Sequence, residues 1–183
     1  DVRFKFGGRE TQALEKLSNK HGTTLYITLL ATLKTILHRY TGAEDIVIGS
    51  PVGHRPSKEL ESVVGLFVNT LALRTEFSGD QSFTALLDQV RTTVLDAFAH
   101  QDAPFEQVVQ SLETDRDWDR SPLFQIMFLW DTDPALQAHN EIVEPVPLPP
   151  PAPKFDLTFS LAKDGDQIAG RIEYRSDLFG EAT

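Results

Sequence analysis

The sequence contains no cysteine among its 183 residues. This absence excludes disulfides, thiolate nucleophiles and cysteine-based zinc sites, and it fits a cytoplasmic protein. Basic residues are also scarce, because 17 Lys and Arg stand against 27 Asp and Glu, for a formal net charge of −10. We therefore expect no nucleic-acid binding, which requires clustered Lys and Arg. No apolar run approaches the roughly 20 residues that span a bilayer, so we expect no membrane segment.

What the sequence does contain is the composition of a packed globular protein. Hydrophobic residues make up 40% of the chain, and 183 residues give room for one large domain or two small lobes. The chain starts with Asp1-Val2-Arg3-Phe4, which is not a signal peptide and lacks an initiator methionine. We interpret the sequence as a piece of a longer protein.

Hydrophobic periodicity predicts strands that alternate with helices. Strands are predicted over residues 2–6, 45–49, 64–74, 124–130, 155–161 and 167–174. Helices are predicted over residues 11–21, 24–40 and 83–98, with Gly22 and Gly42 as stops after the first two, and a short fourth helix follows Pro104. This alternation predicts an α/β fold.

The connections between these elements carry their own signals. Residues 50–62 are predicted to form a polar loop, because their prolines and glycine oppose regular structure. Residues 134–153 hold seven of the eleven prolines and are expected to be extended or irregular. Lys163-Asp164-Gly165-Asp166 predicts a hairpin turn, and residues 176–183 look like the start of a helix.

Two polar residues stand where their side chains need partners. Asn69 lies inside an apolar run, and a buried amide without partners costs about 1–3 kcal/mol. It either braces a neighbouring loop or belongs to a strand that lines a site. Asp102 precedes the fourth helix, where it is predicted to be the N-cap and to accept the amide of Phe105.

The residues alone predict no complete active site. A histidine base needs an orienting carboxylate, and none of the five histidines has Asp or Glu four residues later: His21, His38, His54, His100 and His139. Ser50 lies in Gly-Ser-Pro-Val-Gly, which lacks the Gly-x-Ser-x-Gly pattern of a strained nucleophile. There is no glycine-rich phosphate loop and no metal-ligand spacing, so we expect no catalytic residue and no metal.

Four segments, in order along the chain, resemble motifs of nonribosomal peptide synthetase condensation domains. Residues 64–70 read Val-Gly-Leu-Phe-Val-Asn-Thr, against the family's Val-Gly-x-Phe-Val-Asn-Thr. Residues 100–106 match His-Gln-Asp-x-Pro-Phe-Glu at every position. Residues 116–123 resemble Arg-Asp-x-Ser-Arg-Asn-Pro-Leu, with Asp119 in place of Ser and Ser121 in place of Asn. Residues 45–55 are also similar to the family.

The resemblance implies a particular fold and extent. Family members pair two lobes, each similar to chloramphenicol acetyltransferase, with a mixed sheet covered by helices in an α+β sandwich. The signature His-His-x-x-x-Asp-Gly belongs to the first lobe and does not occur in this sequence. The resemblance therefore implies that residues 1–183 are a C-terminal lobe, without the N-terminal lobe and the final helix, and that this lobe is inactive alone.

The resemblance also implies a reaction, partners and a site. The parent joins a donor acyl- or peptidyl-thioester to an acceptor aminoacyl-thioester, both carried by phosphopantetheine on carrier proteins. The expected partners are the N-terminal lobe and the donor and acceptor carrier proteins, and this lobe is expected to bind no cofactor itself. The lobe would supply one wall of the phosphopantetheine tunnel, with candidates Gly49, Ser50, Pro51, Arg55, Gly65 and Asn69. The other motif residues are expected to be scaffold: Phe67, Thr70, His100, Gln101, Asp102, Pro104, Phe105, Glu106, Arg116, Arg120 and Pro122.

The sequence also allows other functions for this chain. The chain could be a standalone acyltransferase, although it lacks His-x-x-x-Asp, or a noncatalytic module that docks carrier proteins. Epimerisation domains share the lobe architecture, although Phe67-Val68-Asn69-Thr70 favours condensation. We further expect an isolated lobe to expose apolar surface around residues 124–130 and the Pro-rich stretch after them. Such a lobe would self-associate at high concentration or lose order in that stretch.

Overall fold

A computed structural model describes residues 1–53, 55, 57–112, 121–131 and 153–180. The described part forms one mixed sheet with four α-helices and a 3₁₀ helix. Their bounds, in chain order, are β1 Val2–Phe6, α1 Gly8–Lys20, α2 Leu25–Thr41, β2 Asp45–Gly53, η1 Lys58–Ser62, β3 Val68–Glu76, α3 Phe83–Ala99, α4 Phe105–Ser111, β4 Ile126–Asp131, β5 Leu157–Asp164 and β6 Gln167–Tyr174. The predicted α/β class is confirmed.

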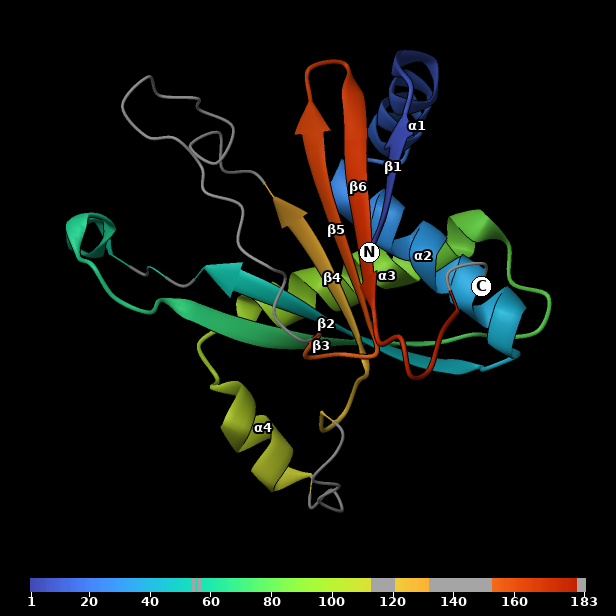
Figure 1. Ribbon diagram of the computed structural model, residues 1–183. Helices are drawn as coiled ribbons and strands as arrows, with labels where there is room; N and C mark the ends of the chain where they lie inside the picture. Colours follow the sequence, from blue (N-terminus) through green and yellow to red (C-terminus); the bar gives the residue numbers. More distant parts are fainter. Residues whose placement is uncertain (54, 56, 113–120, 132–152, 181–183) are drawn as a thin grey trace.

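The sheet has the strand order β1-β6-β5-β4-β2-β3. β4 runs parallel to both β2 and β5, and the other neighbours are antiparallel. β2 pairs with β4 only at Gly49 and Met127, so the two strands diverge beyond this point. Figure 1 shows β2 and β3 running away from the β4–β6 part of the sheet. Within the described residues, β3 is an edge strand.

Helices α1, α2 and α3 lie on one face of the sheet, whereas α4 lies apart from them (Figure 1). The predicted ends of α2 and α3 are confirmed to within one residue, whereas α1 begins at Gly8, three residues before its predicted start. Thr24 Oγ1 accepts the amide of Ile27 at the start of α2, and Gly42 ends that helix at φ 69°. Ser82 caps α3 by accepting the amide of Ala85. These local signals act within a few residues, so the sequence could reveal them.

The core lies between the sheet and helices α2 and α3. Its fully buried apolar residues come from both layers and include Leu30, Ile48, Leu73, Leu87, Val90 and Ile168. Lys34 of α2 is also completely buried in this layer, and its Nζ donates to the carbonyls of Ile46 at 3.0 Å and Leu73 at 2.7 Å. Burial lowers the Lys34 pKa to about 7, against a smaller opposing effect of the Asp45 charge.

The predicted loop over residues 50–62 is wrong in its first part, because β2 continues to Gly53 through Pro51. The amide of Phe77 donates to the Glu44 carbonyl, so these two residues form a hydrogen-bonded pair next to the β2–β3 ladder. Hydrogen-bonded and non-hydrogen-bonded pairs alternate along antiparallel strands, which makes Pro51 a non-hydrogen-bonded position of β2. At Pro51 an amide would therefore point away from β3, toward β4, where pairing has already ended at Gly49. Proline is tolerated here because no ladder bond needs its missing N–H.

The strand predicted over residues 64–74 is shifted in the structure. β3 begins at Val68, and the residues before it connect to η1. The side chains of Val64 and Leu66 are 100% and 91% exposed. An apolar run therefore suggested a strand where the chain forms an exposed connection.

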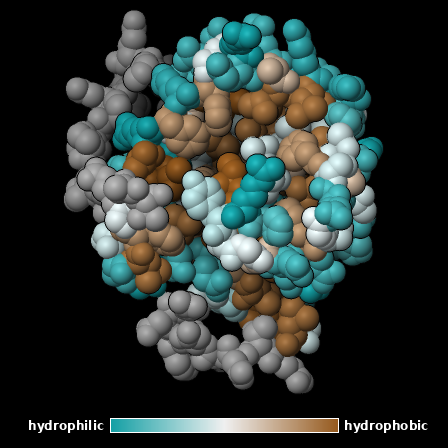
Figure 2. All heavy atoms as spheres, turned by 90° about the vertical axis from the view of Figure 1, so that its right-hand side faces the viewer, coloured by the Kyte–Doolittle hydropathy of each residue, from teal (hydrophilic) through white to brown (hydrophobic). Residues whose placement is uncertain are grey.

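Several other expectations at the surface are corrected. β4 is an interior strand with Met127 and Phe128 buried, so residues 124–130 are not the exposed surface that we expected. Residues 176–178 form a turn rather than a helix. Ile36 and Tyr40 of α2 and Leu112 after α4 are exposed apolar side chains. Figure 2 views the side of α2 and shows hydrophobic side chains among hydrophilic ones.

Of the remaining expectations, one is confirmed and others concern residues outside the described ranges. The hairpin over β5 and β6 is confirmed, with its turn at Gly165, where φ is 62°. The Pro-rich residues 134–152 and residues 116–120 lie outside the described residues, as do His54 and His139. Self-association stays a prediction. In the described part of the chain, no helix has the length and hydrophobicity to cross a membrane.

Candidate functional site

Asn69 joins the start of β3 to the loop between α3 and α4. Its Nδ2 donates to the carbonyls of Gln101 and Ala103, both at 2.8 Å. Its Oδ1 accepts the amides of Thr70 at 2.9 Å and Phe105 at 3.2 Å. An amide side chain has two donor hydrogens and two acceptor lone pairs, so these four bonds use its full capacity.

The fourth bond corrects the predicted N-cap of α4. The residue at the cap position is Pro104, which makes no side-chain cap bond, and the amide of Phe105 is satisfied by Asn69 rather than by Asp102. The cap thus comes from a residue 36 positions earlier in the chain. The interpretation of Asn69 as a brace for a neighbouring loop is confirmed, and a direct bond from Asn69 to a ligand would require breaking one of the four.

A pocket of about 320 Å³ opens at this junction. Two motif segments line it, Leu66 to Thr70 on one side and the α3–α4 loop with the start of α4 on the other: Gln101, Asp102, Pro104, Phe105 and Glu106. These segments are more than 30 residues apart in sequence and meet only in the folded chain. The lining combines aromatic and aliphatic surface with two carboxylates and amide groups, a composition that suits a ligand with both apolar and polar groups.

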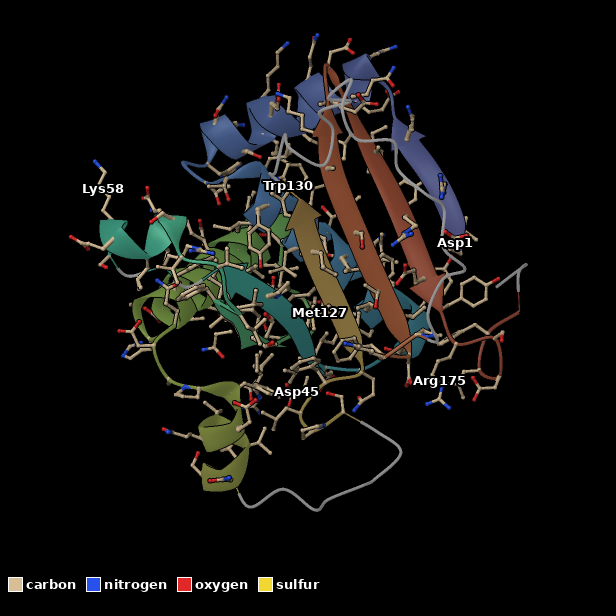
Figure 3. All side chains as sticks on the ribbon, turned by 60° about the vertical axis from the view of Figure 1, so that its left-hand side comes forward. Asp1, Asp45, Lys58, Met127, Trp130 and Arg175 are labelled. Atoms are coloured by element: carbon tan, nitrogen blue, oxygen red, sulfur yellow. The ribbon has the colours of Figure 1, made fainter. Side chains whose placement is uncertain are left out.

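The connection between β2 and β3 is closed by Arg55. We use "the β2–β3 connection" for residues 57–67. Arg55 Nη1 donates to the carbonyls of Leu60 and Val63, the latter at 3.0 Å, and the guanidinium carbon lies 4.3 Å from the centre of the Phe67 ring. Figure 3 shows Lys58 pointing outward at the far end of this connection.

Phe124 ties α4 to the sheet on the face away from α2. Gly49 lies under it, because a Cβ at Gly49 would fall 2.2 Å from the Phe124 ring. The ring also contacts Phe105 at the start of α4 and Phe155 before β5, with centroid distances of 5.5 and 5.7 Å. Gly49, a predicted tunnel residue, therefore has a packing role that explains its lack of a side chain.

Ser50 points to the opposite face, toward α2. Tyr26 donates its hydroxyl hydrogen to Ser50 Oγ at 2.8 Å, and Ser50 donates in turn to the Phe128 carbonyl at 2.9 Å. This second bond spans the diverging β2 and β4 strands. Burial raises the Tyr26 pKa, against a smaller lowering by the bond to Ser50. Ser50 and Pro51 lie within β2, away from the pocket lining, and their tunnel role stays a prediction.

The described histidines have structural surroundings. His21 and His100 follow the C-termini of α1 and α3, and His100 Nδ1 lies 2.8 Å from the Asp96 carbonyl. His38 stacks on Phe77 and lies 2.7 Å from the Ala43 carbonyl. None of the three contacts a carboxylate. In the described ranges no three His, Asp or Glu side chains could hold a metal ion.

The remaining predicted residues are placed as follows. Gly65 and Phe67 lie in the β2–β3 connection, and Thr70 follows Asn69 in β3. Pro122 lies in the segment before β4, where its carbonyl accepts the amide of Phe124. Arg116 and Arg120 are outside the described residues. Sequence reasoning missed Lys34 and the contact of Arg55 with Phe67, because no local pattern marks either.

Comparison with known proteins gives one consistent family. A family model described as the condensation domain matches residues 1–183. The chain is 41% identical over 177 residues to a linear gramicidin synthase of Brevibacillus parabrevis, covering 94% of this chain and 2% of that protein. It is 43% identical over 175 residues to malpinin synthetase of Mortierella alpina, with 94% and 2% covered. The chain thus spans about a fiftieth of the length of these two relatives.

Solved structures agree on the fold. The X-domain from teicoplanin biosynthesis superposes with a TM-score of 0.88 at 25% identity, over 99% of this chain and 42% of that one. A four-domain nonribosomal peptide synthetase bound to AMP and glycine superposes with a TM-score of 0.86 at 24% identity, over 98% and 15%. In both cases the similarity covers nearly all of this chain and less than half of the other.

Proposed function

Because this chain belongs to the condensation-domain family, we propose that it is the C-terminal lobe of a nonribosomal peptide synthetase condensation domain. In this proposal the two-lobe parent forms an amide bond between a donor acyl- or peptidyl-thioester and an acceptor aminoacyl-thioester. Phosphopantetheine arms on two partner carrier proteins present the thioesters. The lobe supplies one wall of the tunnel that receives these arms and binds no cofactor of its own.

The meeting of two motifs around Asn69 carries this proposal. Residues 64–70 and 100–106 carry the family resemblance in sequence, and the structure brings them together around one pocket. A pantetheine arm offers amides and a flexible aliphatic chain, which match the mixed polar and apolar lining of the pocket. Positioning the two thioesters in this way converts a bimolecular attack into an effectively unimolecular one.

The proposed lobe contributes position rather than proton transfer. The attacking amine must lose a proton as the amide forms, which requires a base within hydrogen-bond reach. None of the three described histidines contacts a carboxylate that would orient it. The proton-transfer group therefore belongs, in this proposal, to the other lobe, and residues 1–183 alone are inactive.

The test is a condensation assay on the two-lobe parent and on residues 1–183 alone. Both proteins receive loaded donor and acceptor carrier proteins, and mass spectrometry detects the peptidyl-thioester product. We expect product with the parent and only the buffer rate with residues 1–183.

Three results would overturn parts of this proposal. Product from residues 1–183 alone would show a complete site in this chain. Binding of carrier proteins to an inactive parent would favour a noncatalytic docking module. A change in the stereochemistry of a bound aminoacyl group without amide formation would favour epimerisation.

A further inference from the structure

Arg55 lies next to the pocket but does not line it. Phe67 does line the pocket, and the Arg55 guanidinium carbon lies over this ring, 4.3 Å from its centroid. An arginine over an aromatic face is attracted electrostatically by the quadrupole of the ring. The contact therefore connects an exposed charged residue to a wall of the pocket.

The same guanidinium holds the chain that leads to Phe67. Leu60 lies in η1 and Val63 is its C-cap residue; the Leu60 carbonyl also accepts the Val63 amide, and both residues present their carbonyls to Arg55. Arg55 Nη1 bonds both of these carbonyls with its two hydrogens. A lysine has a single nitrogen and no planar fork, so it cannot stack on the ring in the same way while bonding both oxygens.

Gly65, in the β2–β3 connection, also contributes to the position of the Phe67 ring. A Cβ at this position would lie 3.1 Å from Cε2 of Phe67, closer than most real Cβ contacts. The lack of a side chain at Gly65 thus allows the Phe67 ring to fold back against the backbone. The ring thus lies close to the Gly65 backbone and to the Arg55 guanidinium, while the side chain of Leu66 is exposed.

We infer that Arg55 is a positioning residue that fixes Phe67 as a wall of the pocket and thereby sets the affinity of the pocket for the carrier-bound substrate. This inference rests on the proposed function, because it takes the pocket as the place where a pantetheine-linked substrate lies. Arg55 acts through Phe67 and through the carbonyls of Leu60 and Val63, without touching the substrate. The role differs from the direct tunnel contact predicted from the sequence.

The test compares Arg55→Lys, Phe67→Leu and the double variant in the two-lobe parent. We expect each single change to raise KM for the carrier-bound substrate about fivefold, with kcat within about twofold, because uniform binding is lost. We expect the double variant to be no worse than either single variant, because the two residues act as a unit. Arg74→Lys is the matched control, since Arg74 is an exposed arginine of β3 that pairs with Asp45 away from the pocket.

Amide hydrogen exchange gives a second readout that does not depend on activity. Arg55→Lys should speed exchange across residues 57–67 at least about fivefold, leave α2 and α3 unchanged, and Arg74→Lys should change neither. Wild-type exchange in Arg55→Lys, multiplying effects in the double variant, or a fall in kcat as large as that in kcat/KM would each overturn the inference. If the wild-type parent forms no amide, the proposed function fails, and the exchange result alone then decides the positioning role.

Discussion

At position 69 a side chain must donate to two carbonyls and accept from two amides. Only an amide group provides both pairs, and asparagine has the length that reaches Gln101, Ala103 and Phe105 from β3. The half-buried position makes each unsatisfied partner costly. These four hydrogen bonds explain why an asparagine occurs in an apolar run, and the explanation requires no bound substrate.

We expect Asn69→Ala to lower the free energy of unfolding by about 1–3 kcal/mol, because four backbone groups lose their partner. Asn69→Asp should cost at least as much at neutral pH, since a carboxylate cannot donate and would face two carbonyl oxygens. Urea unfolding measures both. Asn19→Ala, on the exposed face of α1, should change stability by less than about 0.5 kcal/mol. Equal stability of Asn69→Ala and wild type would refute the bracing role.

Lys34 should make stability depend on pH above neutrality. Its folded pKa is lowered to about 7 from 10.5, so the unfolded chain binds more protons between these values. The contribution of Lys34 to stability is therefore lowest below pH 7 and rises as pH increases through this window, by about 2 kcal/mol between pH 7 and pH 9.

Urea unfolding at several pH values checks this rise. Lys34→Met should flatten it, whereas Lys16→Met, which changes an exposed lysine of α1, should retain it. A wild-type curve that stays flat from pH 7 to pH 9 would mean that Lys34 remains charged in the folded protein.

At the scale of elements, β2 contributes side chains to both faces of the sheet and pairs with two neighbouring strands, β3 and β4. Alternation sends Ser50 toward α2 and Gly49 toward Phe124, because successive side chains point to opposite faces. Its hydrogen-bonding partners change along its length, from β3 and β4 together at Gly49 to β3 alone at Pro51. The strand thus links the helix-covered core to the aromatic contacts that hold α4.

Gly49→Ala should destabilise the protein by about 1–3 kcal/mol, because the added Cβ would overlap the Phe124 ring. The displaced ring should also loosen α4, which hydrogen exchange at residues 105–111 would detect. Gly53→Ala is the matched control in the same strand, where an added Cβ meets nothing within 4 Å. Equal effects of the two changes would mean that Phe124 moves aside without cost.

At the scale of the whole molecule, exposed apolar surface gathers in a place that the sequence did not indicate. The interior strand β4 is paired on both sides, whereas Val63, Val64, Leu66 and Val68 are exposed in and beside the β2–β3 connection. Apolar groups clustered in this way commonly mark interaction surfaces. In the proposed parent this connection would be available for contacts beyond this lobe.

We expect residues 1–183 to self-associate at high concentration through this connection. Sedimentation over about a hundredfold range of concentration should show the association, and the double change Val64→Ser with Leu66→Ser should weaken it without lowering stability. Ile36→Ser, an exposed apolar position on α2, should leave the association intact. A strictly monomeric wild-type chain would contradict the expectation.

The sequence by itself determined most of the elements and several of their ends. Strand and helix periodicity, the caps Thr24 and Ser82, and the stops at Gly42 and Gly165 depend on interactions within a few residues, so local sequence suffices. The family also followed from sequence, because its motifs are contiguous. Local patterns failed at the exposed run before β3, where apolar residues do not pack against the core.

Only the tertiary structure decided which distant groups meet. Asn69 replaces Asp102 as the cap of α4, Pro51 is tolerated because β4 has diverged, and Arg55 lies over the ring of Phe67, which lines the pocket. Each outcome depends on a hydrogen bond or contact between segments whose spacing is set by the packing of the whole sheet. Such contacts leave no periodic pattern in the sequence, because their partners are far apart along the chain. Bringing these partners together costs loop-closure entropy, and the contacts form only when the whole sheet has folded.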